Sequence, residues 1–256
     1  MAVTIKSERE IELMRKSGRI LARVHMELGK AIKPGISTWD INVLGEELIR
    51  SYGCIPNFLN YNGYPASICV SVNDEVVHGI PSKKRILKEG DIVSLDAGLI
   101  CEGYHSDAAR TYPVGEISGE AAKLIAVTKR SFFAGIRYAK AGCYLHDISN
   151  AIAAYCGKYR YGVVRDLVGH GIGTSLHEDP PIPNFRQWRR GIKLCPGMTL
   201  AIEPMVNIGS HKVVWLEDDW TVATRDGSLS AHYENTVLIT EGEPEILTLL
   251  PEQKKN

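Results

Sequence analysis

The stretch DIVSLDAGLICEGYHSDAARTYPV, residues 91–114, predicts a β-hairpin. Two extended-type segments, 91–101 and 104–114, are separated only by Glu102-Gly103, and a two-residue loop of this kind joins antiparallel strands. This turn would pair Cys101 with Tyr104 and put Ala109 opposite Asp96. The turn therefore fixes which side chains share a face of the sheet.

Two aspartates of this hairpin are expected to lie close together. Asp107 would be a diagonal neighbour of Asp96 on the same face. One alternative is a pair of solvated strand residues. However, Asp96 lies among apolar residues, and a buried aspartate needs a partner. The setting favours a metal-ligand role for both.

Helices are expected on both sides of the hairpin. Residues 8–28 carry apolar side chains at helical spacing, and Ser7 with Glu10 supplies a capping box before them. A second helix should open at Ser37 or Thr38 and run to about Ser51. Two more are predicted near 121–138 and 145–155.

An internal repeat relates the two helix pairs. Six residues recur as the same or a similar type at a constant offset of 107: Lys33, Gly35, Asp40, Ile41, Gly90 and Asp96 match Lys140, Gly142, Asp147, Ile148, Gly197 and Glu203. An unchanged offset across helical and extended segments indicates duplication. The chain is expected to be one α+β domain, residues 1–256, with halves of about 1–115 and 116–256, since no linker-like composition separates them.

The composition limits the kind of protein. The chain has 256 residues, 44% hydrophobic and 23% charged, with thirty basic and thirty acidic residues. Such a balance gives no global field for nucleic acid or anionic membrane, so no nucleic-acid site and no membrane contact are predicted. The charged N-terminus is no signal peptide, and no apolar run reaches the length of a membrane span.

The six cysteines form no CxxC pair. Reduced thiols in a cytoplasmic protein are therefore expected.

A histidine follows in the glycine-rich segment Gly169-His170-Gly171. We expect a turn after a strand end, with a backbone that needs unusual torsions or a close approach. Taken alone, such a histidine is as often a turn residue as a ligand. His177 adds a second imidazole within reach of the same pocket.

Two glutamates complete the set. Glu203 ends the apolar segment 198–202, where a carboxylate is unfavourable unless it is paired or metal-bound. Glu234 lies in residues 230–238, which are predicted as one strand, and in isolation it could equally be a polar edge residue. The set is stronger evidence for a site than any of its members.

Asp96, Asp107, His170, Glu203 and Glu234 are thus an ordered set of metal-ligand types. Four carboxylates converging in one cavity would repel one another. A pair of divalent cations removes this objection, because two metals can hold and activate one water.

In this order, and with Val77-His78-Gly79-Ile80-Pro81 upstream, the chain closely resembles the bacterial-type (type I) methionine aminopeptidases. Further matching motifs are residues 11–18 (IELMRKSG), 63–65 (GYP), 169–173 (GHGIG) and 220–221 (WT). The resemblance covers essentially the whole chain. It implies the pita-bread fold: two pseudo-symmetric halves, a curved antiparallel sheet and helices on its outer face.

The resemblance also implies roles for the ligands. Asp96 would chelate one metal, His170 and Glu203 the other, and Asp107 and Glu234 would bridge both. A metal-bridging hydroxide would attack the carbonyl carbon and release the N-terminal methionine ahead of a small second residue, with Glu203 as proton acceptor. The carboxylate-rich set suits Mn²⁺, Fe²⁺ or Co²⁺ at least as well as Zn²⁺.

Three further groups of residues are carried over from the same family. His177 would donate to the carbonyl oxygen, and His78 would lie near the substrate amide nitrogen or the leaving group. The methionine pocket would comprise Tyr61, Tyr64, Cys69, His78, His177 and Trp220, with Phe58 and Leu176 as departures from the common pattern. Asn73 and Ser230 match positions that help to hold a monovalent cation, although Asn73-Asp74 could equally be a β-turn.

The implied partners are the N-termini of nascent polypeptides. The resemblance implies that the protein acts on them as a monomer in the cytoplasm, in some cases at the ribosome. No zinc-finger cysteine array is present to dock there.

Two other hypotheses remain open at this point. A pita-bread peptidase of the Xaa-Pro type usually carries an extra N-terminal domain, for which this chain has no room. A non-catalytic binding module should have lost ligands, whereas all five ligand types are present.

Overall fold

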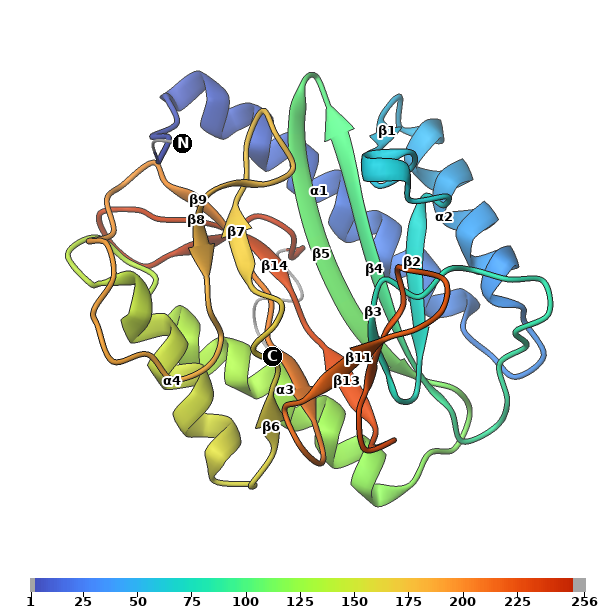
Figure 1. Cartoon of the computed structure of the whole chain (residues 1–256). Coiled ribbons are helices and arrows are strands. Elements are labelled where there is room, and N and C mark those ends of the chain that lie inside the picture. Colours follow the sequence, from blue (N-terminus) through green and yellow to red (C-terminus); the bar gives the residue numbers. More distant parts are fainter. Residues whose placement is uncertain (1–2, 251–256) are drawn as a thin grey trace.

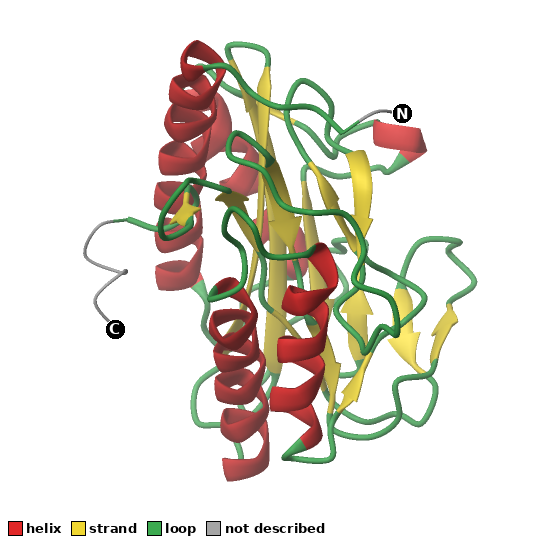
Figure 2. Ribbon diagram, turned by 90° about the vertical axis from the view of Figure 1, so that its left-hand side faces the viewer, coloured by secondary structure: helices red, strands yellow, loops and turns green. Residues whose placement is uncertain are grey.

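Four α-helices lie together on one face of a layer of antiparallel strands in the computed structural model, which describes residues 3–250 (Figures 1 and 2). The helices are α1 Glu8–Ala31, α2 Thr38–Ser51, α3 Gly119–Ile136 and α4 Leu145–Gly157, with a short 3₁₀ turn, η1, at Tyr61–Gly63. No helix in this range is both long and apolar enough to cross a bilayer.

The strands fall into two larger sheets and two small ones. The first larger sheet has the order β1-β4-β2, with β5 paired to β4, and the second has the order β15-β14-β9-β7-β8. The strand bounds are β1 Ile55–Pro56, β2 Ile68–Val72, β3 Glu75–Val77, β4 Ile92–Cys101, β5 Tyr104–Pro113, β6 Gly162–Val163, β7 Gly169–Gly171, β8 Glu178–Ile182, β9 Thr199–Ile202, β10 Met205–Asn207, β11 Val213–Trp215, β12 Val222–Thr224, β13 Ser230–His232, β14 Asn235–Leu238 and β15 Glu245–Ile246.

The central hairpin β4–β5 has the predicted register. Cys101 pairs with Tyr104, Asp96 pairs with Ala109, and Asp107 lies opposite Gly98. The turn residues Glu102 and Gly103 have φ of 50° and 85°, the two positive values that a two-residue hairpin turn of type I′ needs. The prediction that Asp107 is diagonal to Asp96 is therefore confirmed.

The helices begin close to where their caps predict. Ser7 and Glu10 form the expected capping box, and Ser37 caps α2. Four boundaries were wrong by two or three residues: α1 continues to Ala31, α3 starts at Gly119 and ends at Ile136, and α4 continues to Gly157. Helix ends depend on tertiary packing as well as on local pattern, so such shifts are ordinary.

The repeat at offset 107 is visible in the hydrogen bonds. Gly35 N donates to Leu87 O and Gly142 N to Leu194 O, each glycine having a φ near 90°. The isolated bridges Ser37–Ile86 and Tyr144–Lys193 are related by the same offset. Matching contacts between matching residues confirm the two pseudo-symmetric halves. That the chain forms one domain, and that its halves divide near residue 115, stays a prediction.

The two halves meet along β5 and the segment that enters β14. Ala109 and Glu234 exchange backbone hydrogen bonds of 3.4 and 2.9 Å. Thr236 Oγ1 accepts from Asp107 N and donates to Asp107 O, both at 2.9 Å. Behind this seam each helix pair packs on its own sheet and buries a separate apolar cluster. The seam therefore fixes Asp107 and Glu234 side by side.

Helix α1 crosses the C-terminal segment at Gly18, where a Cβ atom would lie 2.6 Å from Leu247 O. We predict that Gly18→Ala lowers the free energy of unfolding by about 1–3 kcal/mol, because the backbone must move to admit a methyl group. Gly157→Ala is the matched control, since nothing lies within 4 Å of the added atom. It should be neutral or stabilise by up to about 1 kcal/mol. Urea unfolding curves compare the two, and an unchanged midpoint for Gly18→Ala contradicts the prediction.

Candidate active site

One cavity of about 200 Å³ brings the predicted site residues together. It opens on the face of the strands opposite the helices. Its lining includes every metal-ligand, catalytic and methionine-pocket side chain proposed from the sequence: Phe58, Tyr61, Tyr64, Cys69, His78, Asp96, Asp107, His170, Leu176, His177, Glu203, Trp220 and Glu234. It includes neither Asn73 nor Ser230. Asn62 is a further lining residue that the sequence did not indicate.

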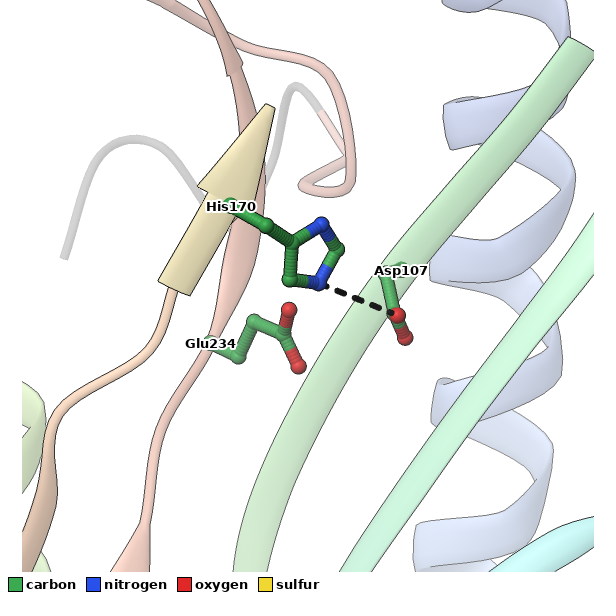
Figure 3. Close-up of side chains that lie close together, drawn as sticks. All are labelled: Asp107, His170 and Glu234. Atoms are coloured by element: carbon green, nitrogen blue, oxygen red, sulfur yellow. Dashed lines mark ion pairs between the residues drawn. The ribbon is translucent and has the colours of Figure 1, made fainter. Parts of the chain in front are cut away.

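The five ligand-type side chains come from both halves. Asp96 lies on β4 and Asp107 on β5, whereas His170 lies on β7 and Glu203 directly follows β9. One ligand atom from each of Asp107, His170 and Glu234 lies within 4.8 Å of the others (Figure 3). His170 Nε2 is 3.9 Å from Asp107 Oδ2 and 3.7 Å from Glu203 Oε1.

The sequence had suggested a turn at His170, but the structure has a strand there. Gly169–Gly171 is strand β7, and His170 pairs with Ala201 of β9. The glycines are required by close approach: a Cβ at Gly169 would lie 2.3 Å from Ala201 O, and one at Gly171 would lie 2.2 Å from Asp179 O. The tight spacing of β7 against its neighbours holds the imidazole at the cavity.

Glu234 also differs from its prediction. The expected strand over 230–238 is broken into β13 and β14, and Glu234 lies in the interruption. The guanidinium of Arg110 donates to Glu234 O and, at 2.5 Å, to Asn235 Oδ1. This anchoring turns the Glu234 carboxylate into the cavity rather than across the sheet.

Burial gives the four carboxyl groups abnormal acidity. Desolvation raises the pKa of Asp96 to about 7 and that of Glu203 to about 8. Desolvation and the neighbouring carboxylates raise the pKa values of Asp107 and Glu234 well above the ordinary range. A cation bound between these four carboxyl groups would offset both the desolvation and the mutual repulsion that make them resist ionisation. The cluster therefore favours a shared cation.

The histidine of the cluster is neutral. Burial lowers the pKa of His170 to about 3, so its contacts with the carboxylates are not charge pairs. A neutral imidazole is the form that binds a metal. Within residues 3–250, Asp96 Oδ1, Asp107 Oδ1 and Glu234 Oε1 are buried without a hydrogen-bond partner. Unpaired buried oxygens beside a neutral imidazole fit a divalent-metal site.

Aromatic and sulfur side chains form the other wall of the cavity. The rings of Tyr64 and Trp220 meet edge to face with centroids 5.2 Å apart, and Tyr64 Oη donates to Gly79 O at 2.9 Å. Phe58, Cys69 and Leu176 are buried in the same cluster. This wall is apolar and lies next to the carboxylates.

His78 reaches the cavity through a strained backbone. Its φ of 59° is uncommon for a residue with a side chain. Burial lowers its pKa to about 4, so the ring is neutral at pH 7. The next residue must be glycine, because a Cβ at Gly79 would lie 2.4 Å from Val70 O.

His177 is held by a tyrosine. Tyr61 Oη lies 2.7 Å from His177 Nδ1, and the His177 ring lies 4.2 Å from that of His170. The neighbouring Glu178 forms an ion pair with the buried Lys6 at 2.6 Å. These contacts fix the segment that carries His177.

His232 is a site residue that the sequence analysis missed. Its Nε2 lies 3.6 Å from Glu203 Oε2, and the ring is 1% exposed. Its position two residues before Glu234 was the only available signal. The break between β13 and β14, which brings it beside Glu203, has no local sequence pattern.

Comparison with known proteins agrees with this geometry. The model of metallopeptidase family M24 matches residues 12–241. The methionine aminopeptidase of Clostridium acetobutylicum is 56% identical over 247 residues, which cover 96% of this chain and 99% of that protein. The crystal structure of methionine aminopeptidase from Thermotoga maritima aligns with a TM-score of 0.95 and 46% identity, covering 97% of this chain and all of the other.

A buried cluster of four carboxylates and one imidazole beside an apolar pocket is the arrangement of a metallohydrolase. The chain belongs to metallopeptidase family M24 and, within it, to the methionine aminopeptidases. The pita-bread fold expected from the resemblance is confirmed. A Xaa-Pro dipeptidase from Bacillus anthracis shares the fold at a TM-score of 0.77, but at 24% identity and over 62% of its own length.

The carboxylate cluster predicts an unusual pH dependence of stability. Asp96 and Glu203 have folded pKa values of about 7 and about 8, above their ordinary values of 3.8 and 4.5. A raised folded pKa gives stability that is complete below the unfolded pKa and is lost as pH rises through the folded one. Buried histidines act in the opposite direction, but only below their ordinary pKa of 6.5. The chelated protein should therefore lose stability between about pH 6.5 and pH 8.

Urea unfolding of chelated and Mn²⁺-saturated protein across this range tests the expectation. Bound metal keeps the carboxyl groups ionised in the folded state, as they are in the unfolded state, so the stability of the saturated protein should no longer fall over this range. Asp107→Asn should reduce the loss of stability of the chelated protein. A chelated protein whose stability is flat or rises over this range contradicts the prediction.

Proposed function

We propose that this chain removes the N-terminal methionine from polypeptides in a metal-dependent hydrolysis, with preference for a small second residue. The observation that carries the proposal is the single cavity in which five ligand-type side chains face an apolar pocket. The proposal is supported by 56% identity, over nearly the whole chain, to a methionine aminopeptidase.

The placement of the side chains supports the ligand assignment that the family resemblance implies. Asp96 would hold one divalent ion, His170 and Glu203 the other, and Asp107 and Glu234, fixed side by side at the seam, would contact both. Mn²⁺, Fe²⁺ or Co²⁺ suits this oxygen-rich set at least as well as Zn²⁺. Bound divalent ions supply Lewis acidity, which acidifies a water and polarises the scissile carbonyl.

Glu203 is the proposed proton acceptor. Its carboxyl group lines the cavity beside the other ligand-type side chains, and an ionised carboxylate there can accept a proton from the attacking water. His232 lies 3.6 Å from Glu203 on the side of the helices and limits the orientations of that carboxyl group.

His177 is the proposed donor to the carbonyl oxygen. When Tyr61 donates to Nδ1, the neutral ring carries its proton on Nε2, which is then free to donate as negative charge develops. By the family resemblance His78 would lie near the substrate amide nitrogen or the leaving group; its ring lines the same cavity, 6.3 Å from the ring of Trp220.

The methionine side chain would occupy the apolar wall. Aromatic and sulfur groups suit a thioether, and Tyr64, Cys69 and Trp220 supply them. Phe58 and Leu176 set the width of the pocket.

We extend the proposal to a monovalent cation near Asn73 and Ser230. Ser230 N donates to Asn73 O at 2.9 Å, so the two residues adjoin. Asn73 has a φ of 60°, and its side chain bonds Asp91 and Ile92 N. The turn expected as the alternative is therefore present at the same place.

The proposed substrates are nascent polypeptides. The enzyme would act on them as a monomer in the cytoplasm, in some cases at the ribosome. Six free thiols are compatible with a reducing compartment.

A metal-dependence assay tests the function. The chelated protein with added Mn²⁺ or Co²⁺ should release methionine from Met-Ala-Ser and should not cleave an Ala-Pro peptide. Asp96→Asn and His170→Ala should each lower kcat at least about 10²-fold, because a metal ligand is lost. Glu47→Gln is the control, since Glu47 is an exposed residue of α2 and does not line the cavity. Wild-type activity in either ligand variant, or no metal-dependent cleavage at all, refutes the proposal.

A second experiment tests the role of His177. His177→Ala should lower kcat about 10²–10³-fold and leave KM and metal affinity nearly unchanged, because the hydrogen bond forms mainly in the transition state. Tyr61→Phe should have a smaller effect in the same direction. Steady-state kinetics with calorimetric metal titration measures both. If KM rises while kcat is unchanged, His177 is a binding residue instead.

A further inference from the structure

Although the net charge of the chain is zero, its basic and acidic residues are unevenly distributed along the sequence. Residues 121–202 contain twelve lysines and arginines but only four aspartates and glutamates, so the rest of the chain has eighteen basic and twenty-six acidic residues. A local field of one sign can recruit a partner even when the total charge is zero. The expectation that no nucleic acid would be attracted was based on the total alone.

The fold places several of these cations, among them Arg130, Arg137, Lys158 and Arg186, along adjoining grooves on one outer surface. Helices α3 and α4 pack side by side (Figure 2), so closely that a Cβ at Gly135 would lie 2.7 Å from Ile152. The loop between β8 and β9 is tied to the start of α4, with Leu145 N donating to Ile192 O and His146 N to Arg190 O. The basic residues of three segments thus share a surface away from the active-site cavity.

Trp188 is presented on this surface in an unusual way. The side chain is 90% exposed, the largest value among the exposed apolar residues of the described chain. Arg186 stacks over its ring at 5.1 Å, and Gln187 N donates to Asn150 Oδ1 of α4 at 2.8 Å. The Trp188 ring is therefore held facing solvent beside the guanidinium group of Arg186.

A groove of about 640 Å³ runs next to Trp188. Arg186 and Trp188 line one side, and the small side chains of Ala153, Ala154 and Gly157 on α4 line the other. A second groove of about 440 Å³ adjoins it at Ala154 and is lined by Arg130, Arg137 and Lys158 together with aromatic rings. Neither groove has a carboxylate in its lining.

The arginines of the loop are not neutralised. Among residues 3–250, no ion pair within 4.0 Å involves Arg186, Arg189 or Arg190, and Arg190 instead stacks on Tyr144 at 4.4 Å. Unpaired guanidinium groups beside exposed rings are suited to phosphates and bases.

We propose that this surface binds a single-stranded segment of RNA. The phosphates lie along the arginines of the loop and of α3 and α4, and one base stacks on Trp188 in the groove. An anionic membrane fits less well, because within residues 3–250 the only other large apolar side chains exposed nearby are Tyr138 and Ile192. The binding is independent of the peptidase reaction, since none of these residues lines the active-site cavity.

Fluorescence anisotropy with a labelled oligouridylate of about twelve nucleotides tests the proposal. Wild-type protein should bind at low salt, and the logarithm of its affinity should fall linearly with the logarithm of salt concentration. Trp188→Ala should weaken binding about tenfold. The double variant Arg186→Gln/Arg189→Gln should weaken binding and reduce the salt slope by about 1–2.

Two matched controls lie elsewhere on the chain. Trp215 is also exposed, but it is followed by Glu217, Asp218 and Asp219, so Trp215→Ala should leave RNA affinity unchanged. The double variant Arg19→Gln/Arg23→Gln removes two exposed arginines of α1 and should change affinity less than about twofold. Cleavage of a methionyl peptide by all four variants verifies that they are folded.

Four outcomes would overturn the proposal. They are no wild-type binding at low salt, equal binding by Trp188→Ala, an equal loss in Trp215→Ala, and competition by polyglutamate or by phosphatidylserine vesicles as strong as that by RNA. The last would assign the surface to acidic proteins or membranes.

Discussion

The mutual repulsion of four buried carboxylates is the constraint on which this structure depends. The four carboxylates would move apart if the backbone allowed it. The fold prevents separation by placing them on elements that cannot move independently: the paired strands β4 and β5, the tight strand β7, the end of β9 and the interruption before β14. The resulting strain is electrostatic, and divalent cations relieve it. The site is therefore held in its binding geometry by the rest of the molecule, as catalysis by metals requires.

Duplication explains where the site lies. Asp96 and Glu203 occupy the same position in two copies of one unit, and the matching bonds of Gly35 and Gly142 show that the copies still share their turns. Helices α1 and α2 cover one apolar cluster and helices α3 and α4 another, while two further clusters contain residues of both halves. What neither half supplies alone is a complete ligand set, which forms only where β5 and Glu234 meet. Divergence outside this seam is less restricted, and the basic surface of α3 and α4 belongs to one copy only.

Much of the fold followed from local rules. A two-residue turn fixes strand register, so the pairing of Asp96 with Ala109 was predictable. Helical spacing and capping residues located four helices to within a few residues. The errors arose where contacts across the chain override local pattern. His170 resembled a turn residue because its glycines serve a close approach to Ala201 and Asp179, and Glu234 resembled a strand residue because Arg110 anchors the interruption from another element. Total charge, likewise, says nothing about how the charges are distributed over the surface.

From the amino-acid sequence alone came the hairpin, the repeat, the candidate ligands and the family resemblance, because turn length, helical period and residue type act over a few neighbouring positions. The three-dimensional structure was needed to bring Asp107, His170 and Glu234 within 4.8 Å, to place His232 beside Glu203, and to collect scattered arginines on one surface around Trp188. These distances depend on how the two halves fit against each other. No local pattern records that fit, because Asp107, His170 and Glu234 are more than sixty positions apart and the other residues come from separate elements of the fold.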